Sequence, residues 1–520
     1  MKGSTLLKSQ LKAGAVLSFV ALFLNSAISI LYTPIMLKLI GPSEYGLYSL
    51  ATSTVGFVGV LNFGLGNALI RYTAKYKVLK DEEGCSRLYG MFFLMYGVLG
   101  AIALIVGIIL TLNSHTAFSH SLSLNEVQKL KYLMGILTLN ISTGIGFGIF
   151  SVIILAQEKF IFQKMIGILN SIVNPIIMLP LLLMGHDSVS IVIVATVLNF
   201  ITILINMYYC FKVLKIKIIF DKFEIKLFKE ITVFSFFIFL NLIIDKIYWS
   251  TDQIILGIYS GTLAVSIYSI GASFSGYFSG FAASISNVFL SKITGMVTKE
   301  VSDEELSDLF IRIGRIQYIV ISFALSGFIV FGQEFINLWV GENYSKSFYI
   351  ALLIVVPMII SLIQSIGGVI LQAKNMQKFK TTVNFVIAIG NVLLSIIFVQ
   401  WWGAIGCAIA TAIAYTIGNI IIMNIYYWKK IHINIPRFWK NILLMSVPFI
   451  ASLAIGVKIN NLILTNTWFV LFIKISVFSV VYILLMWYIG MNKLEKELFI
   501  VPIKRILTFF RKKNVLNRAS

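Results

Sequence analysis

The chain has 520 residues, 58% of them hydrophobic and only 12% charged, and its mean hydropathy is +0.93. This composition excludes a soluble globular protein, because one fold cannot hide so much apolar side-chain surface from water. The apolar runs are also far longer than the strands of a membrane barrel. We therefore predict an all-α polytopic membrane protein, and the net charge of +21 must be explained in that setting.

Fourteen apolar segments are long enough to cross a bilayer as helices, which takes about 20 residues. The first six spans are expected to form one lobe, residues 1–230, and the next six a second lobe, residues 231–430, around a central cavity. Residues 431–520 are expected to add two spans and a basic tail. The predicted spans are 13–40, 45–70, 88–111, 127–156, 164–184, 189–212, 231–258, 263–290, 313–332, 347–372, 381–399, 403–427, 441–458 and 467–489.

Lys and Arg are distributed unequally between the two sides of these spans. Of 42 such residues, 35 fall in the tails and in the loops of one side. Cytoplasmic loops carry an excess of Lys and Arg, so this side is predicted to be cytoplasmic and to hold both termini. The basic charge then follows from orientation in a plasma membrane and needs no nucleic-acid partner. Lys246 and Lys474 lie inside spans, and Lys474 is expected to reach the outer interface by snorkelling.

The chain contains an internal repeat. A shift of 220 places Tyr48 on Tyr268, and a shift of 217 places Asn174 on Asn391. Each half has an even number of spans, so both halves enter the membrane from the same side. We therefore predict parallel repeats related by an axis along the membrane normal, an arrangement known from transporters.

The seventh span keeps charges that a crossing helix seldom keeps. Each costs about 2.5–3.5 kcal/mol near the bilayer centre on insertion scales, so such side chains usually face protein or water. At 100° per residue, one face holds Asn241, Asp245, Tyr248, Trp249 and Asp252, with Lys246 at its edge. Two interpretations stay open: a surface lining a water-filled cavity, and a buried Asp–Lys arrangement that locks neighbouring helices.

The repeat assigns a matching stripe to the first span. Asn25 is the mate of Asp245, Ser29 of Trp249, and Tyr32 of Asp252. A pseudo-twofold axis would place the two faces opposite each other across a cleft. We expect substrate to bind there, because binding between repeats near the midplane is usual in transporters.

Two cytoplasmic segments carry local patterns. Residues 215–230 alternate basic and apolar side chains, which is typical of a segment lying on the inner leaflet. The sequence Ser302-Asp-Glu-Glu305 has capping-box spacing and predicts the start of a short helix in its loop.

Catalytic and metal-binding motifs are missing from the sequence. We find no P-loop, no His-Glu-x-x-His pattern and no cysteine pair with metal-ligand spacing. No serine or cysteine has an identifiable base, and no outer loop is long enough to form a domain. The sequence therefore predicts a carrier rather than an enzyme, with no cofactor and no bound metal.

Several motifs resemble one known family. Gly41-Pro-Ser-Glu-Tyr-Gly-Leu-Tyr48 and Asn62-Phe-Gly-Leu-Gly-Asn-Ala-Leu-Ile-Arg71 are similar to the opening of bacterial polysaccharide-biosynthesis flippases of the Wzx type. That family belongs to the multidrug/oligosaccharidyl-lipid/polysaccharide exporter superfamily. The segment Asp252-Gln-Ile-Ile-Leu-Gly257 resembles its seventh-span motif, but Gln253 stands where the family usually has a basic residue. The resemblance covers nearly the whole chain.

The resemblance implies transport of undecaprenyl-pyrophosphate-linked oligosaccharide to the outer leaflet, for O-antigen, capsule or related surface polysaccharide. It implies alternating access driven by H+ or Na+, in a membrane that could also hold a glycan polymerase partner. A sugar diphosphate needs a partly cationic cavity, so Lys246 and Arg71 are candidates for binding it. Asp245 and Asp252 are candidates for ion coupling or for fixing Lys246, and Arg71 could instead anchor the inner end of its span.

Two rival functions remain. A cation-coupled multidrug antiporter of the same superfamily would share the fold and the acidic residues, although it usually has twelve spans. A non-transporting scaffold of a glycan-synthesis complex would need no polar stripe facing its own interior.

Overall fold

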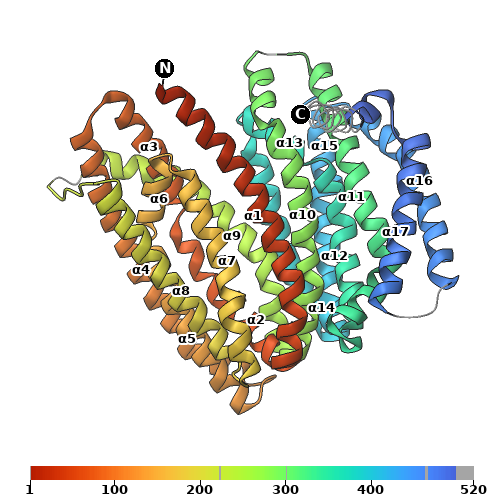
Figure 1. Ribbon diagram of the computed structural model, residues 1–520, viewed down its shortest axis with the longest axis horizontal. Coiled ribbons are helices and arrows are strands. Elements are labelled where there is room, and N and C mark those ends of the chain that lie inside the picture. The colour runs from red at the N-terminus through yellow and green to blue at the C-terminus, as the bar shows by residue number, and fades with distance from the viewer. Residues whose placement is uncertain (1, 222–223, 300, 463–466, 499, 501–520) are drawn as a thin grey trace, which may run out of the picture. The chain divides into compact units, whose positions relative to one another are not determined.

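The computed structural model describes residues 2–221, 224–299, 301–462, 467–498 and 500, so most of the predicted basic tail lies outside the described residues. Every regular element of the described part is a helix (Figure 1). The chain divides into two compact units, each described here by itself. Unit 1 comprises Met1–Ser273 and Thr381–Ala414, and unit 2 comprises Phe274–Lys380 and Tyr415–Ser520. The units divide the chain by its internal contacts, whereas the predicted lobes divide it by the sequence repeat. The lobe boundaries at 230 and 430 therefore stay a prediction.

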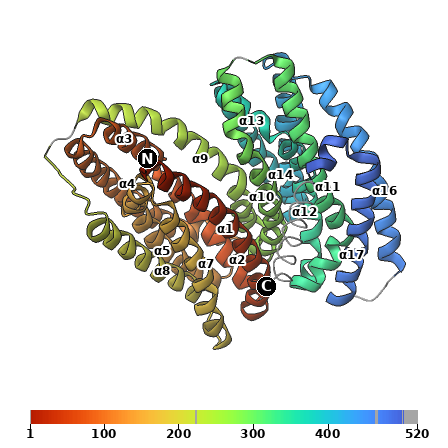
Figure 2. The ribbon, with the colours of Figure 1, turned by 45° about the horizontal axis from the view of Figure 1, so that its top comes forward.

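Unit 1 contains long helices that pack lengthwise on one another. Figures 1 and 2 show α4, α5 and α8 side by side, and α1 packs along α7. Its helices are α1 (Lys2–Ile40), α2 (Pro42–Gly56), α3 (Leu65–Leu79), α4 (Glu82–Phe118), α5 (Leu124–Gly146), α6 (Ile149–Ala156), α7 (Phe160–Leu183), α8 (Ser188–Tyr208), α9 (Ile225–Tyr259), the first part of α10 (Gly261–Thr298) and the main part of α14 (Gln377–Tyr415), with a 3-10 helix at Val58–Asn62 and a π-helical turn at Tyr209–Val213.

Unit 2 is organised around α11, which contacts α12, α16 and α17. It also contains the second part of α10 and the first residues of α14. Its remaining elements are α11 (Asp303–Val340), α12 (Ser345–Ile363), α13 (Ser365–Ala373), α15 (Met423–Lys429), α16 (Ile435–Leu462), α17 (Trp468–Leu485), the 3-10 helix Glu342–Tyr344 and π-helical segments at Thr416–Ile422 and Met486–Gly490.

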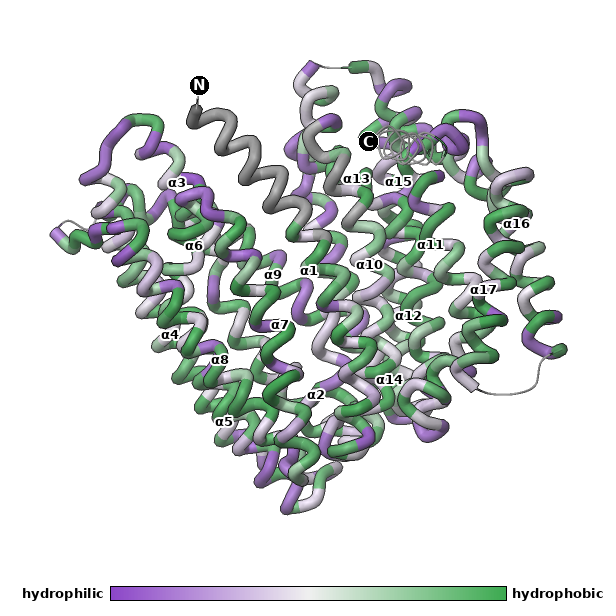
Figure 3. The backbone as a smooth tube through the Cα atoms, in the orientation of Figure 1, coloured by the Kyte–Doolittle hydropathy of each residue, from purple (hydrophilic) through white to green (hydrophobic). Residues whose placement is uncertain are grey.

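The helices match the predicted spans. Twelve segments of the described residues are long and apolar enough to cross a membrane. One of them, Gln377–Lys429, contains Gly403 with non-helical φ 55° and ψ −130°, which separates the predicted eleventh and twelfth spans. The predicted eighth span corresponds to α10. Within unit 1, hydrophilic residues gather at helix ends while the middle lengths are hydrophobic (Figure 3). The all-α polytopic membrane fold is therefore confirmed.

The prediction of a short helix after Ser302 is wrong in one respect. Ser302 does cap a helix, because its Oγ accepts a hydrogen bond from the Glu305 amide at 3.2 Å. That helix is α11, which continues for 38 residues and forms the ninth span itself. The pattern marks where a helix begins but carries no information about its length.

The motif beginning at Gly41 builds a tight turn and a polar cluster at one end of unit 1. Gly41 has φ 82°, and Pro42 follows at the first turn of α2, where no backbone donor is needed. Lys129 of α5 pairs with Glu44 at 2.6 Å and with Asp187 at 2.7 Å. Partial burial raises the pKa of Asp187, but the bonds from Lys129 and a backbone amide outweigh it, so this pKa lies below its usual value.

Small residues of α2 and α9 allow α2 to approach α9 and the start of α10. A Cβ on Gly46 would lie 2.0 Å from the Thr262 carbonyl oxygen, and one on Gly257 would lie 2.5 Å from Leu50. One turn further along, Ser53 donates a hydrogen bond to Gln253. The contacts recur every three to four residues of α2, which is the spacing of one helix face. Close helix approach through small residues is the usual way to pack spans in lipid.

Unit 2 holds its last two spans with buried ion pairs. Lys474 of α17 is only 1% exposed, and its ammonium bonds Glu334 of α11 at 2.9 Å and Asn460 of α16 at 3.1 Å. The expectation that Lys474 snorkels to the interface is therefore wrong, because a partner inside the protein is closer than water. Near the other end of α11, Arg315 forms a two-bond pair with Glu495 at 2.5 and 2.9 Å.

Gly46→Ala should destabilise the protein by about 1–3 kcal/mol, because the added methyl group forces α2 and α10 apart. Gly97→Ala is the matched control, since a Cβ there meets nothing within 4 Å. Denaturant unfolding in detergent micelles measures both. Equal stability of the two variants would contradict the close contact at Gly46.

Lys474→Met should destabilise the protein by about 3–5 kcal/mol, because it leaves the Glu334 carboxylate buried without its cation. The double variant with Glu334→Gln should recover most of this loss, since no buried charge then remains. Lys458→Met, at an exposed position of α16, is the control and should be nearly neutral. Thermal unfolding of the purified variants is the measurement, and a double variant as unstable as Lys474→Met would contradict the ion-pair account.

Candidate functional site

Asp252 is the most enclosed of the predicted site residues. It lies on α9 in unit 1 and is 2% exposed. Its carboxylate accepts hydrogen bonds from Tyr268 Oη at 2.5 Å, Ser395 Oγ at 2.7 Å and Thr411 Oγ1 at 2.8 Å. Tyr268 belongs to α10 and the other two to α14, so three helices meet at one side chain. None of the ion pairs among the described residues includes Asp252.

This arrangement suits a proton or a small hard cation. A buried carboxylate that faces hydroxyl groups but no ammonium or guanidinium carries an uncompensated charge unless it binds a positive species. The surrounding atoms are oxygens, the ligand type that hard cations prefer. Asn391, fully buried, brings its Oδ1 to 3.3 Å from Thr411 Oγ1, while its Nδ2 has no hydrogen-bond partner. The Nδ2 group of Asn391 is thus a hydrogen-bond donor that the neighbouring helices leave unused.

The first half of the chain has no such carboxylate at the equivalent positions. With the repeat offsets, Tyr32 corresponds to Asp252, Tyr48 to Tyr268, and Met178 to Ser395. Tyr32 and Tyr48 pack against an apolar cluster that contains Met178. The two halves therefore have equivalent positions but different side chains at them. The carboxylate of Asp252 has no counterpart at the equivalent position of the first half.

Lys246 lies on another side of α9, toward α2. It is half-buried, and its ammonium is 3.3 Å from Ser250 Oγ and only 2.7 Å from where a Cβ on Gly56 would stand. Its hydrogen bond goes to a hydroxyl, while Asp252 bonds three other hydroxyls. The alternative in which Asp252 fixes Lys246 therefore finds no contact in this structure.

The other residues of the predicted polar face differ in exposure. Asn241 and Asp245 are exposed, and Asn241 accepts a hydrogen bond from Thr381 at 3.1 Å. Trp249 is 40% exposed and packs edge-on against the half-buried Tyr248, with ring centroids 5.4 Å apart. One helical face thus runs from exposed polar groups at Asn241 to a buried carboxylate two to three turns later.

The matching stripe of the first span packs elsewhere. Asn25 is exposed, Ser29 is half-buried, and the hydroxyl of Tyr32 is buried without a hydrogen-bond partner. The two spans also differ in their main neighbours, because α1 packs along α7 while α9 packs on α2. The roles of these residues stay predictions.

Arg71 is placed far from Lys246. Its guanidinium lies over the ring of Phe234, 5.3 Å from the centroid. Phe234 is twelve residues before Lys246 on α9, which is about 18 Å along a helix axis. The two candidate cations are therefore not gathered around a single diphosphate in this conformation.

Sequence reasoning missed the partners of Asp252. The repeat singled out Tyr268 and Asn391 as matched positions but gave them no role. Asn391 and Ser395 stand four residues apart in an apolar span, so they share one helical face, and Thr411 follows in the next span. The polar residues of spans eleven and twelve were the one sequence feature that could have indicated these partners of Asp252.

The comparisons agree with this fold. A family model described as polysaccharide biosynthesis protein matches residues 11–290, and no curated protein matches the chain. Solved structures with the same fold include the lipid II flippase MurJ in an inward closed conformation, at 19% identity over 91% of this chain and 97% of that one, with a TM-score of 0.70. An inward-facing MATE multidrug resistance transporter of the MOP superfamily has 15% identity over 82% and 99%, with a TM-score of 0.64. A MOP superfamily transporter from Pyrococcus furiosus has 16% identity over 80% and 96%, with a TM-score of 0.56.

The chain is thus a multi-pass membrane protein with the transporter fold of MurJ and the MATE proteins. Because the matched segment covers more than half of its residues, it belongs to the polysaccharide biosynthesis protein family. The resemblance and the fold class expected from the sequence are both confirmed.

Proposed function

We propose that the protein is a flippase that moves undecaprenyl-pyrophosphate-linked oligosaccharide repeat units from the cytoplasmic to the outer leaflet of a bacterial plasma membrane. Transport would use alternating access and would supply O-antigen, capsule or a related surface polysaccharide. Both termini would be cytoplasmic, and a glycan polymerase is a candidate partner. The family supports a role in polysaccharide synthesis. The proposal rests mainly on the position of Lys246 inside a span and on its contacts there.

Lys246 is a cation kept inside a span, and none of the ion pairs among the described residues includes it. Such a residue costs about 2.5–3.5 kcal/mol on insertion, and a structural lysine would be expected to have an acidic partner, as Lys474 has. An ammonium with one hydroxyl contact retains hydrogen-bond donors for an anionic ligand. The diphosphate of the lipid carrier is an anion of this kind, and the polyprenyl chain would remain in the lipid. The substrate-binding roles of Arg71, Asn25, Ser29, Tyr32, Tyr248 and Trp249 belong to the same proposal.

We further propose that Asp252 binds the coupling ion, H+ or Na+, with Asp245 as the second candidate. Its burial, its three hydroxyl partners and the lack of a described cationic partner support Asp252. Asp245 is exposed, so it needs no bound ion to offset burial.

Lys246→Gln should abolish translocation while leaving expression and folding unchanged, because removing a charge from a span lowers its insertion cost. The assay uses the purified protein in vesicles loaded with the lipid-linked oligosaccharide, with an enzyme outside that reaches only the outer leaflet. Lys38→Gln, at an exposed position of α1, is the matched control and should translocate normally. Normal translocation by Lys246→Gln would remove Lys246 from the site.

Two further results would favour the rivals over the flippase. Efflux of amphipathic cations by the wild-type protein in a drug-susceptible host, without any flipping, would favour the multidrug antiporter. Flipping and efflux that are both absent from well-folded wild-type vesicles would favour the scaffold. Deleting the gene in its host and identifying the lipid-linked glycan that accumulates inside would name the sugar.

Asp252→Asn should uncouple translocation from the ion gradient, leaving slow exchange that no longer responds to imposed pH or sodium gradients. The amide can still accept hydrogen bonds from the neighbouring hydroxyls but cannot bind the ion as a carboxylate does. Asp245→Asn, measured in parallel, separates the two candidates. Gradient-driven transport at the wild-type rate in Asp252→Asn, together with its loss in Asp245→Asn, would move the coupling site to Asp245.

A further inference from the structure

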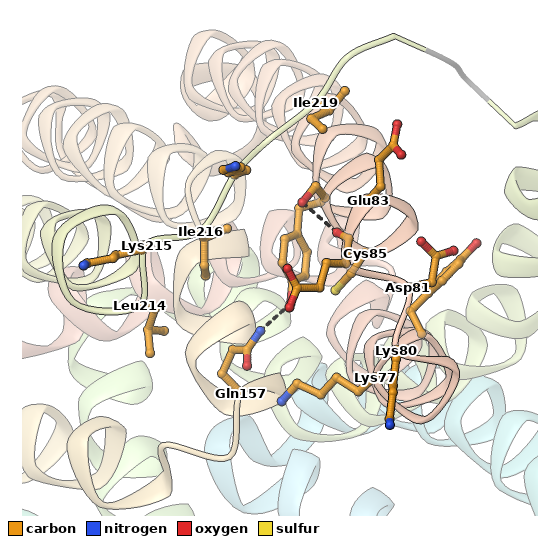
Figure 4. A pocket seen from close by; sticks show the side chains of 15 residues that line it. Lys77, Lys80, Asp81, Glu83, Cys85, Gln157, Leu214, Lys215, Ile216 and Ile219 are labelled. Atoms are coloured by element: carbon orange, nitrogen blue, oxygen red, sulfur yellow. Dashed lines mark hydrogen bonds between the residues drawn. The ribbon is translucent and has the colours of Figure 1, made fainter.

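Unit 1 contains a cavity of about 730 Å³ at the end of the helix bundle where α3 ends and α4 begins. Its walls come from three places that are far apart in the sequence: residues 76–89, Gln157 just beyond α6, and the irregular segment 214–219. Figure 4 shows Lys77 and Gln157 at the bottom of the view, Asp81 and Glu83 at the start of α4 on the right, and Leu214, Lys215 and Ile216 on the left. None of these residues has a role in the proposed transport cycle.

The segment 214–219 is held in place across α4 and so makes the cavity. The Ile219 amide donates a hydrogen bond to the Ser86 carbonyl at 3.2 Å. Gly90 permits this approach, because a Cβ there would lie 2.0 Å from the Ile219 carbonyl oxygen. Arg87 then pairs with Asp221 at 3.1 Å. The stretch predicted to lie on the inner leaflet is thus partly a strap fixed to α4.

The cavity has more free cationic groups than free carboxylates. Among the ion pairs of the described residues, none involves the four lining lysines, which are Lys77, Lys80, Lys215 and Lys217. Of the three lining carboxylates, Glu83 is paired with Arg87, which leaves Asp81 and Glu82 against the four lysines; Asp81 also accepts the Gly84 amide at 2.7 Å as the cap of α4. This balance favours an anionic ligand over a cationic one.

The surface beside the cavity is apolar and exposed. Val78 is 84% exposed and Leu79 63%, and they stand between the lining lysines Lys77 and Lys80; Phe220 is 59% exposed and follows the lining residue Ile219. Exposed apolar side chains next to clustered lysines are typical of a surface that sits in the headgroup region of a membrane. A site for a soluble cytosolic anion would not need this apolar border.

We propose that this cavity binds the phosphodiester headgroup of an anionic lipid of the inner leaflet, with Lys77 and Lys217 as phosphate contacts and the acyl chains on the apolar border. Lys77 reaches across the cavity wall, since its ammonium donates to the Ala156 carbonyl at 3.1 Å and keeps two further donors. The bound lipid would fasten α3, α6 and the strap to one another. This inference is independent of the substrate and the ion proposed above.

The test measures binding of phosphatidylglycerol to the full-length protein by native mass spectrometry, in nanodiscs of phosphatidylcholine with increasing phosphatidylglycerol. Wild type should retain phosphatidylglycerol in preference to phosphatidylcholine. Lys77→Gln/Lys217→Gln should bind it about thirtyfold more weakly, from the usual contribution of two lysines near an anionic lipid. Lys75→Gln/Lys212→Gln removes the same charge at exposed positions outside the lining, one on α3 and one in the turn just before the segment 214–219, and should bind like wild type.

Each outcome bears on the proposal. Equal weakening in both double variants would overturn it, because the effect would then be general surface charge. Loss of retained lipid on adding millimolar glycerol 3-phosphate would also overturn it, in favour of a soluble phosphate ligand. If the Lys77→Gln/Lys217→Gln variant does not fold, the lipid preference of the wild-type protein tests the proposal. A wild-type protein that retains phosphatidylglycerol and phosphatidylcholine equally would reject the site.

Discussion

The burial of Asp252 is the constraint on which much of unit 1 depends. A carboxylate that is 2% exposed has to be hydrogen-bonded, and its donors come from α10 and α14. These bonds fasten both helices to α9, so the acid joins three helices at one side chain. The equivalent place in the first half holds Tyr32 and Met178 instead. At these equivalent positions, the carboxylate is present in the second half and a tyrosine in the first.

The charged groups inside the spans include two kinds. Lys474 with Glu334 and Arg315 with Glu495 are buried pairs, and each partner satisfies the other. Removing one member of such a pair is costly, which identifies these pairs as structural. Lys246 and Asp252 instead form hydrogen bonds with hydroxyl groups, and neither takes part in an ion pair among the described residues. A charged side chain without an ion-pair partner can bind a charged ligand, whereas one held in a buried ion pair stabilises the fold. The presence of an ion-pair partner therefore distinguishes candidate site residues from structural ones better than the charge itself or its position along the span.

Much of the fold could be predicted from the sequence, because hydropathy and Lys/Arg distribution are properties of single segments. All fourteen predicted spans correspond to helices, and the charges of the seventh span were recognised. What failed depends on contacts between segments. The partner of Lys474 is 140 positions away, and Ser395 and Thr411 look ordinary until α14 is placed beside α9. The length of α11 could not be read from its cap at Ser302 either.

The arrangement of α9 shows how the two proposed ligands could influence each other. Lys246 faces α2, where a Cβ on Gly56 would lie 2.7 Å from its ammonium, whereas Asp252 faces α10 and α14. An ion at Asp252 would strengthen the attachment of α9 to α10 and α14, because it removes the repulsion of a bare buried charge. A diphosphate at Lys246 would act on the opposite attachment, to α2. Both ligands then bias the position of one helix, and such a shared two-state element is what coupling between separate sites requires.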